Sequence, residues 1–416
     1  MKNKLSLLVL IALLSFPYAS KAANYKVVGY FADWSGNATG MMNNINYDAL
    51  THINYAFAIP NDANGYMYIG NPNLLKGLVT KGHAAGVKVN ISVGGANSSG
   101  DFRGICANNT YRNRFLDTCV NFIKKYNLDG LDLDWEFPND ATEKVMLEEL
   151  LRDLRTKFDD AYQSYGKYIE LTVATTGTDY YGNTLTHDAT GYLDYINIMS
   201  YDDSPPHHST YSYAQSCLGY WSSVRGVTPG MLVLGVPFYS RSTGAGYTSY
   251  SSIASSDPSG AYNDQDGYFM KNGFNHDYNS MPVLKQKASA VKNTYKAAGM
   301  MIWELTQDRT DQYSLLDVIG SEMGTYVSVQ SAPKEIHEIK SYPNPFTQET
   351  YIDLQQLNTQ DENVLIEISD MNSKIIYSQS HPTNQYFVFN ANVSAGMYFC
   401  KISDSSASYN AKLIKE

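Results

Sequence analysis

Between Asp129 and Glu136 the chain reads Asp-Gly-Leu-Asp-Leu-Asp-Trp-Glu, in which acidic and apolar residues alternate. This period of two predicts a β-strand with Asp132, Asp134 and Glu136 on one face and the apolar side chains on the other. We call these three acids the acidic wall. Alternate strand positions lie about 6.5 Å apart, so three carboxylates in a poorly solvated place cannot all ionise without cost. The pattern predicts a proton shared within the wall.

Eight short apolar runs, separated by helical-looking segments, place this strand in a larger fold. Strands that alternate with helices predict a parallel sheet, and eight of them predict a closed α/β fold, the (β/α)8 TIM barrel. Helical periodicity is clearest at 112–125 and 145–162. An open, doubly wound sheet is the alternative. The eight runs are 27–31, 51–57, 87–93, 128–135, 168–174, 195–200, 232–237 and 300–305.

The acidic wall is predicted to end at the mouth of this barrel, where active sites lie. Phe137-Pro138-Asn139 interrupts the run directly after Glu136. A carboxyl group at the mouth, with another two residues deeper, suits proton transfer. A purely structural role as buried hydrogen-bonded acids is the alternative, and the cost of burying three carboxylates disfavours it. Asp129 has the opposite parity, and we expect it to be structural.

The first residues have the pattern of a secretory signal peptide at 1–22. Lys2 and Lys4 precede an apolar run at 5–16 and a small-residue cleavage site that ends at Ala22. The run is too short for a transmembrane helix, and we find no later candidate for one. We therefore expect the mature protein to be exported.

The amino-acid composition limits the classes of molecule that this protein could bind. The formal charge of -10 and the pI of about 5.3 argue against nucleic acid and favour a neutral substrate. Four cysteines are too few for a disulfide scaffold, and their spacing is not that of a zinc site. A Cys106–Cys119 disulfide and unpaired buried thiols both remain open.

Residues 25–325 form the predicted barrel domain, and the pattern changes beyond it. Residues 326–340 are predicted to be a linker, and 341–416 a small all-β, sandwich-like C-terminal module. Its short alternating runs are separated by Asn, Asp, Ser and Gly. They lie at 351–354, 364–368, 374–377, 386–389, 396–402 and 409–414.

The stretch at Asp129–Glu136 resembles the signature D-G-x-D-x-D-x-E of glycoside hydrolase family 18, the chitinase family, at every fixed position. The resemblance extends over roughly residues 25–325. Further motifs stand at the ends of other predicted strands: S-x-G-G at 92–95, M-x-Y-D at 199–202, Gly-Val-Pro-Phe-Tyr at 235–239 with Arg241 after it, and Trp303.

The resemblance implies a role for each acid. Glu136 would protonate the glycosidic oxygen and later activate water, Asp134 would orient the substrate's acetamido group, and Asp132 would take up the proton. Tyr201 would donate a hydrogen bond from its hydroxyl group to the intermediate. Taken singly, Tyr201 and the tryptophan of the last strand have plain structural alternatives. The implied substrate-binding residues are Tyr30, Phe57, Ser92, Met199, Asp202, Tyr239, Arg241 and Trp303.

The geometry of the wall bears on the mechanism. A typical retaining glycosidase needs a second carboxylate about 5.5 Å from the acid, across the sugar, whereas these acids lie along one strand. The nucleophile must come from elsewhere. The resemblance implies the substrate's own 2-acetamido oxygen, an oxazolinium intermediate and overall retention, with no metal and no organic cofactor.

We therefore expect a secreted, endo-acting hydrolase of β-1,4-linked N-acetylglucosamine that acts as a monomer on chitin or its oligosaccharides. An endo-β-N-acetylglucosaminidase that cuts the core of N-glycans is the alternative, and a lectin-like protein is disfavoured by the presence of Glu136. The motifs Asp-Trp-Glu and Gly-Val-Pro-Phe-Tyr resemble those of chitinases more than those of the N-glycan enzymes.

Two departures from the family pattern concern the cleft. Ala96-Asn97 follows S-x-G-G where an aromatic residue often stands, which puts a product-side stacking platform in doubt. The segment between Tyr239 and Met300 is short, so we expect a shallow, open groove. Its tyrosines are candidates for packing within the loop or for sugar subsites: Tyr247, Tyr250, Tyr262 and Tyr268.

The C-terminal module resembles the sorting domain of the type IX secretion system. The residues that carry the resemblance are Tyr342-Pro343-Asn344-Pro345-Phe346, Ser394-Ala395-Gly396-Met397-Tyr398, Lys412 and Lys415. It implies contact with secretion machinery and a secreted or cell-surface location. A carbohydrate-binding sandwich is the alternative, disfavoured because the module lacks tryptophan.

Overall fold

The computed structural model of the protein divides into two units, Met1–Ser328 and Val329–Glu416. The predicted signal peptide and residues 326–334 of the predicted linker lie outside the described residues. The structure describes residues 25–61, 63–96, 100–204, 207–244, 246–263, 267–271, 274–325, 335–357, 359, 361–371, 374–390, 392–404 and 407–416.

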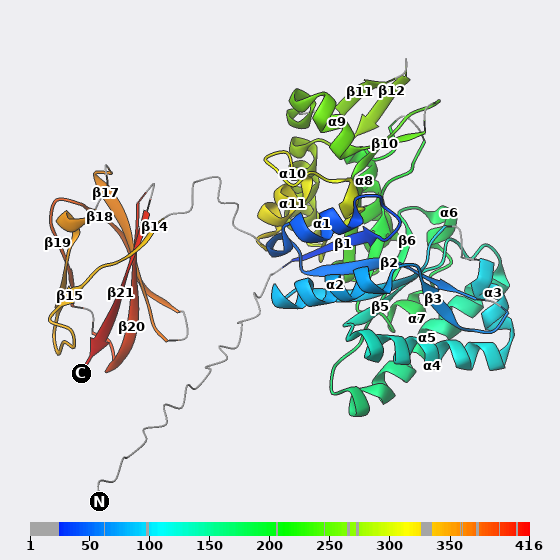
Figure 1. The fold of residues 1–416 in the computed structure, drawn as a ribbon, viewed down its shortest axis with the longest axis horizontal. Helices are drawn as coiled ribbons and strands as arrows, with labels where there is room; N and C mark the ends of the chain where they lie inside the picture. The colour runs from blue at the N-terminus through cyan, green and yellow to red at the C-terminus, as the bar shows by residue number, and fades with distance from the viewer. Residues whose placement is uncertain are drawn as a thin grey trace, which may run out of the picture. The chain divides into compact units, whose positions relative to one another are not determined.

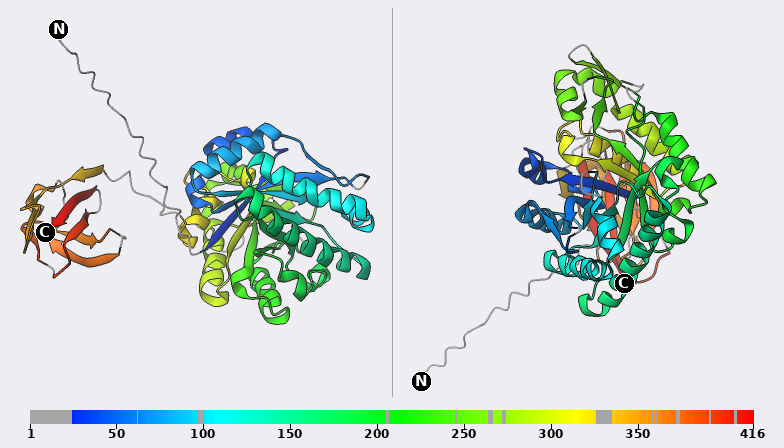
Figure 2. Two further views of the ribbon diagram at one scale, coloured as in Figure 1. Left: turned by 90° about the horizontal axis from the view of Figure 1, so that it is seen from below. Right: turned by 90° about the vertical axis from the view of Figure 1, so that its right-hand side faces the viewer.

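The first unit is a closed parallel barrel of eight strands, which confirms the predicted TIM barrel (Figures 1 and 2). Strand β1 pairs in parallel with both β2 and β13, so the sheet closes and the open-sheet alternative is wrong. A short strand, β3 (Met67–Ile69), adds to β2 in antiparallel orientation. The barrel strands are β1 (Lys26–Ala32), β2 (His52–Pro60), β4 (Lys88–Gly94), β5 (Gly130–Asp134), β6 (Glu170–Thr176), β7 (Tyr195–Met199), β8 (Leu232–Pro237) and β13 (Gly299–Trp303).

Helices surround the barrel, as the left view of Figure 2 shows. Both helices predicted from periodicity are present, and both have side-chain caps: Asn108 before α4 and Asp140 before α5 accept bonds from backbone N–H groups of the first turn. The α-helices of this unit are α1 (Ala38–Asn44), α2 (Pro72–Ala84), α3 (Gly100–Ala107), α4 (Asn109–Tyr126), α5 (Ala141–Tyr165), α6 (Asp179–Gly182), α7 (His187–Thr190), α8 (Tyr211–Gly219), α9 (Tyr250–Ser256), α10 (Met281–Ser289) and α11 (Leu315–Met323).

The interior of the barrel is polar beneath its mouth. Barrel interiors are usually filled by branched apolar side chains, but Asn54, Asn90, Ser92, Thr172 and Asn197 are all fully buried here. The main apolar core of this unit is formed by a separate set of residues that includes helical and strand side chains. The polar interior provides hydrogen-bond donors for a buried acid.

The segment after β8 forms a small antiparallel sheet in the order β10-β9-β12-β11. Its strands are β9 (Tyr239–Arg241), β10 (Tyr247–Ser249), β11 (Gly267–Lys271) and β12 (Phe274–Tyr278). Tyr250 is buried and donates to the Tyr313 carbonyl, so it packs within the structure as expected. Tyr247 and Tyr262 are exposed. The side chain of Tyr268 lies outside the description.

The second unit contains two β-sheets, β14-β21-β20-β17-β18 and β15-β16-β19, around one apolar core. Residues 335–338 were predicted to be linker, and that prediction is wrong, because β14 pairs in parallel with β21. The pairing links segments about seventy residues apart, which a local pattern does not reveal. The strands are β14 (Glu335–Glu338), β15 (Ser341–Tyr342), β16 (Thr350–Asp353), β17 (Asn363–Ser369), β18 (Ile375–Pro382), β19 (Tyr386–Phe389), β20 (Gly396–Ser403) and β21 (Ala407–Lys415).

Gly94, at the end of β4, provides a test of the barrel rim. Its φ is +118°, and a Cβ atom there would lie 2.1 Å from the Asp134 carbonyl oxygen. Gly94→Ala should lower the free energy of unfolding by about 2–4 kcal/mol, because it adds backbone strain and a clash with main chain. Chemical denaturation measures the change. Gly230→Ala, which meets no atom within 4 Å, should change it by less than about 0.5 kcal/mol; equal effects would contradict the assignment.

Candidate active site

Asp132 is the deepest member of the acidic wall and is fully buried. Its Oδ2 accepts hydrogen bonds from Tyr30 OH at 2.7 Å and Ser92 Oγ at 2.8 Å. Its Oδ1 accepts from Thr172 Oγ1 at 2.6 Å and Asn197 Nδ2 at 3.1 Å. Burial raises the pKa of Asp132, and these four donors oppose the rise. Four donors around one carboxyl favour its ionised form.

Asp134 and Glu136 both line a cavity above Asp132. Burial, with the charges of Glu136 and Asp132, raises the pKa of Asp134 well above its usual range. Burial and the charge of Asp202 raise the pKa of Glu136 to about 7. Near neutral pH, Glu136 can therefore both hold and release a proton. This is the property required of a group that acts in turn as acid and base.

Asp202, at the end of β7, is held by neighbours from β9 and from its own loop. Tyr239 OH and Arg241 Nε each donate to Oδ1 at 2.7 Å, and Arg241 Nη2 donates to Oδ2 at 2.6 Å. His208 Nδ1 lies 3.4 Å from Oδ1. Burial alone would raise the pKa of Asp202, but the contacts with His208, Arg241 and Tyr239 lower it well below its usual range. Asp202 is thus a fixed anion beside Glu136.

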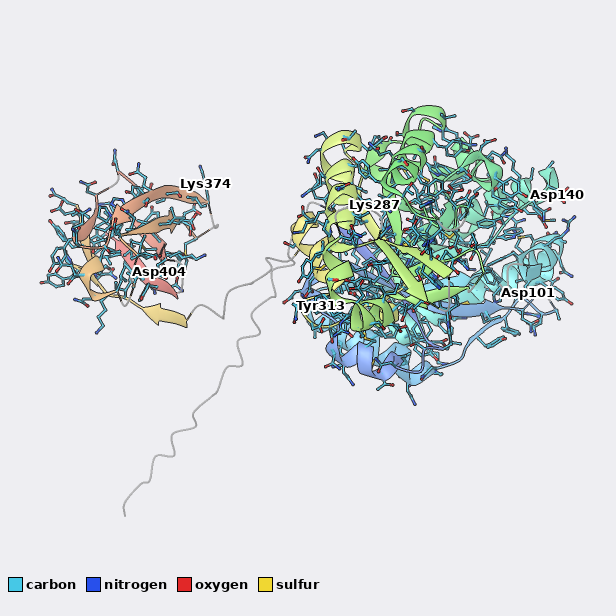
Figure 3. The ribbon with its side chains drawn as sticks, turned by 90° about the horizontal axis from the view of Figure 1, so that it is seen from above. Asp101, Asp140, Lys287, Tyr313, Lys374 and Asp404 are labelled. Atoms are coloured by element: carbon cyan, nitrogen blue, oxygen red, sulfur yellow. The ribbon has the colours of Figure 1, made fainter. Side chains whose placement is uncertain are left out.

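A buried lysine fixes the same loop. Lys287 Nζ donates to the Ser209 carbonyl at 2.6 Å and to Asn279 Oδ1 at 2.7 Å. Lys287 is fully buried, within the first unit (Figure 3). Because Ser209 lies directly after His208, these bonds limit movement of the segment that contacts Asp202.

Aromatic rings form one wall of the mouth. Trp303 lies at the end of β13, with Phe57 of β2 stacked at 5.6 Å and Tyr30 edge-on at 5.5 Å between ring centroids. Trp34 stacks on Phe57 at 5.7 Å and is 60% exposed. A large exposed indole that continues a row of stacked rings suits the face of a sugar ring.

The cavity has a volume of about 630 Å³ and brings most of the predicted site residues together. Eight of the twelve line it: Tyr30, Asp134, Glu136, Met199, Tyr201, Asp202, Arg241 and Trp303. Of the other four, Asp132 and Ser92 lie in the hydrogen-bond network below it, Phe57 stacks on Trp303, and Tyr239 contacts Asp202. Tyr201 is buried, with its hydroxyl 3.9 Å from Met301 Sδ.

Several further residues at the site were not identified from the sequence. Thr172 and Asn197 contact Asp132 from β6 and β7, and a polar residue between apolar neighbours was the available signal. Trp34 had no motif to mark it. Phe137 and Tyr181 stack at 4.6 Å in the cavity wall, beside the exposed Tyr180. Their meeting depends on how the loops after β5 and β6 fold.

Other predictions concern cysteines, metals and membranes. All four cysteines are buried free thiols, so of the two open alternatives the structure has the unpaired one. In the part of the chain that the structure describes, no group of three or more His, Cys, Asp or Glu side chains could hold a metal ion. Among these same residues, no helix combines the length and apolarity needed to cross a membrane.

Comparison with known proteins gives two family matches. Residues 26–308 match the model of glycosyl hydrolases family 18, and residues 340–416 match that of the secretion system C-terminal sorting domain. Chitinase A1 of Niallia circulans is 28% identical over 422 aligned residues, which cover 73% of this chain and 60% of that protein. The chain spans less than two thirds of the length of the first curated relatives it matches.

Solved structures agree with these matches. A chitinase from Bacteroides thetaiotaomicron is 28% identical with a TM-score of 0.62, and the match covers 74% of this chain and 99% of that one. A variant of the class V chitinase from Nicotiana tobaccum, solved in complex with NAG4, has a TM-score of 0.63 at 22% identity, with 72% of this chain and 99% of that one covered. At that identity the likeness shows the fold alone.

Thr172→Val tests the support of Asp132. The variant keeps the shape of the side chain but removes the donor at 2.6 Å, so the pKa of Asp132 should rise further and the free energy of unfolding at neutral pH should fall by about 1–3 kcal/mol. Carboxyl ¹³C NMR titration and chemical denaturation measure the two changes. Thr80→Val, at an exposed helical position, is the control. An unchanged titration of Asp132 would show that Thr172 contributes nothing.

Proposed function

This chain belongs to glycosyl hydrolase family 18, and we propose that it is an exported, endo-acting chitinase that hydrolyses β-1,4-linked N-acetylglucosamine with retention. The observation that carries the proposal is the partly buried Glu136 with its pKa raised to about 7, beside Asp134 in an aromatic-walled cavity. A polymer of neutral sugars also fits the net negative charge of the chain.

In the first step, the substrate's acetamido carbonyl oxygen attacks C1 while Glu136 gives its proton to the glycosidic oxygen. The C1–O bond breaks, the shortened chain leaves with that proton, and an oxazolinium ion remains. Asp134 accepts a hydrogen bond from the acetamido N–H and so directs its oxygen to C1. The Tyr201 hydroxyl donates to the same group.

In the second step, the Glu136 carboxylate takes a proton from water as the water oxygen attacks C1. The oxazolinium ring opens, the acetamido group is restored, and the anomeric configuration is retained. The contacts of Asp202 argue against the alternative in which an enzyme carboxylate is the nucleophile. Both of its oxygens accept bonds from Tyr239 or Arg241, so it is poorly placed to attack as a nucleophile itself.

The substrate class follows from this chemistry. A substrate-assisted mechanism requires a 2-acetamido group on the sugar whose C1 atom belongs to the bond that is cut. Trp303 lines the cavity, whereas Trp34 beside it does not. The aromatic surface therefore continues beyond the cavity, which favours an oligomer or polymer. The complex of the tobacco enzyme with NAG4 makes an N-acetylglucosamine oligomer the first substrate to test.

We further propose that the C-terminal unit directs export. The match of residues 340–416 to a secretion system sorting domain supports this, and the predicted N-terminal signal would bring the chain to that system. Chitin is insoluble, so an enzyme that degrades it must act outside the cell. Export and hydrolysis are therefore consistent with each other.

A side-by-side assay tests the proposed reaction. Wild-type protein should cut chitin hexamer internally and leave a high-mannose glycopeptide intact, as mass spectrometry of the products would show. Glu136→Gln should lower turnover by about 10²- to 10⁴-fold while sugar binding and thermal unfolding remain as in the wild type. Cleavage of the glycopeptide alone would move the function to N-glycan deglycosylation, and full activity of the variant would refute the role of Glu136.

The pKa of Glu136 sets a second test. The first step needs the protonated acid, so kcat/KM should fall about tenfold per pH unit above pH 7. Asp202→Asn removes a charge that helps to raise this pKa, and the alkaline limb should shift to lower pH. Asp203→Asn, on the next residue of the cavity wall, is the comparison. An alkaline limb that stays in place in Asp202→Asn would contradict the electrostatic assignment.

A further inference from the structure

The second unit has an unusual outer face on its five-stranded sheet. Along β20, Tyr398, Cys400 and Ile402 point into the core, so Phe399 and Lys401 point outward. The outward positions of a sandwich are normally polar, but Phe399 is 48% exposed and Ile375 on β18 is 55% exposed. Apolar side chains in such positions indicate an interaction surface.

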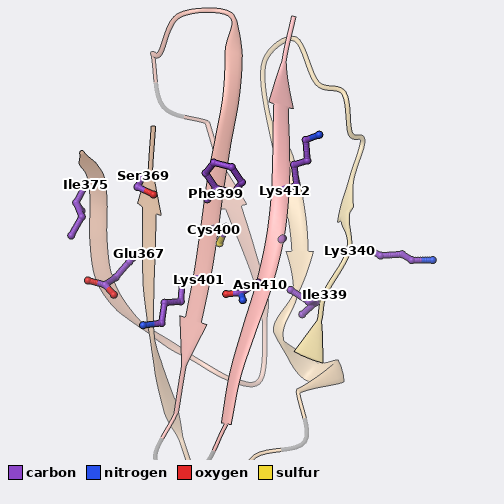
Figure 4. Close-up of a pocket in the computed structure, with 11 residues that line it drawn as sticks. Ile339, Lys340, Glu367, Ser369, Ile375, Phe399, Cys400, Lys401, Asn410 and Lys412 are labelled. Carbon is purple, nitrogen blue, oxygen red and sulfur yellow. The ribbon is translucent and has the colours of Figure 1, made fainter. Parts of the chain in front are cut away.

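These side chains line a groove of about 600 Å³ (Figure 4). The strand register places them in two rows across the sheet. Ser369 lies opposite both Ile375 and Phe399, and Phe399 lies opposite Lys412. In the next row, Lys401 lies between Glu367 and Asn410. One row therefore combines the apolar Ile375 and Phe399 with Lys412, and the other combines Lys401 with Glu367 and Asn410.

Charge is segregated onto this face. Residues 335–416 contain five lysines, no arginine and ten aspartates and glutamates, of which Glu335 and Glu338 stand on the edge strand β14 of this same sheet. Three of the five lysines line the groove, namely Lys340, Lys401 and Lys412, together with one acid, Glu367, which lies opposite Lys401. The described residues that line the groove therefore carry a net positive charge within a unit that is acidic as a whole, which attracts an anionic partner.

The spacing of the groove favours one kind of anionic partner. Phe399 and Lys401 are two residues apart on one strand, about 6.5 Å, and the side chains on one face of an extended peptide repeat at the same distance. A peptide along β20 can place an apolar side chain on Phe399 and an acidic one on Lys401. A polysaccharide would need more stacking rings than the single Phe399.

We propose that this face binds an extended acidic segment of a partner protein, with apolar side chains on Phe399 and Ile375 and carboxylates on Lys401, Lys412 and Lys340. The proposal deepens the export function proposed above, and rests on it only for the expectation that the partner belongs to the export apparatus. It is independent of hydrolysis, because it uses no residue of the barrel.

The test measures binding of a fluorescein-labelled peptide of alternating glutamate and leucine to the full chain by fluorescence anisotropy. Wild-type protein should bind it at least tenfold more tightly than a peptide of alternating lysine and leucine. The double variant Lys401→Glu/Lys412→Glu and the single variant Phe399→Ser should each weaken binding at least tenfold. Lys374→Glu, an exposed lysine of the same unit outside the groove, should stay within twofold of wild type.

Circular dichroism and thermal unfolding show whether each variant folds, and Lys412→Gln provides a milder change if the double variant does not. An equal loss in Lys374→Glu, or no preference for the acidic peptide, would overturn the proposal. Binding to phosphatidylglycerol vesicles in place of the peptide would also overturn it, in favour of a membrane surface. Retention of the wild-type chain inside a host with the secretion system would refute the export function. The peptide-binding result would still decide whether this face binds an acidic segment.

Discussion

The burial of Asp132 and Asp134 on one strand, with the partly buried Glu136 just beyond its end, is the constraint on which the rest of the barrel depends. An ionised carboxyl removed from water is unstable unless it is hydrogen-bonded or paired. Asp132 meets this requirement with four donors, from β1, β4, β6 and β7. The barrel interior is therefore polar where a barrel is usually apolar. The donors of this polar layer oppose the rise that burial causes in the pKa of Asp132, and burial, the charge of Glu136 and the charge of Asp132 together raise the pKa of Asp134 above it.

Asp202, the fourth acid of the site, lies at the mouth of the barrel and is stabilised in a different way. Asp202 is not neutralised by a proton but by Arg241, Tyr239 and His208, which keep it ionised. Its fixed charge helps to raise the pKa of Glu136 to about 7. Asp202 thus has a low proton affinity because it has a cationic partner, whereas Glu136 has a high one because it is desolvated and close to an anion. Enzymes commonly divide acid and base roles between two carboxyl groups in this way.

The same alternation of side chains along a strand operates in the second unit with a different outcome. In β5 it separates acids from apolar residues; in β20 it separates the sandwich core from an outer row that includes Phe399 and Lys401. A sandwich of two sheets needs only one face of each sheet for its core. The other face of the five-stranded sheet is free to differ from ordinary surface, and the lysines and the exposed Phe399 that line its groove do so.

The sequence alone determined the eight barrel strands, the two long capped helices and the alternating strands of the second unit, because period-two and period-3.6 patterns are local properties of the chain. It also placed the acidic wall at a strand end, and its motifs named eight of the seventeen residues that line the cavity. Tertiary structure alone decided which polar side chains reach Asp132, since Thr172 and Asn197 meet it only through strand pairing around the closed barrel. It likewise decided that Trp34 extends the row of rings at Phe57, and that Glu335–Glu338 joins a sheet as β14. Those contacts join segments far apart in the chain, and a local pattern contains no information about which distant segment will lie beside it.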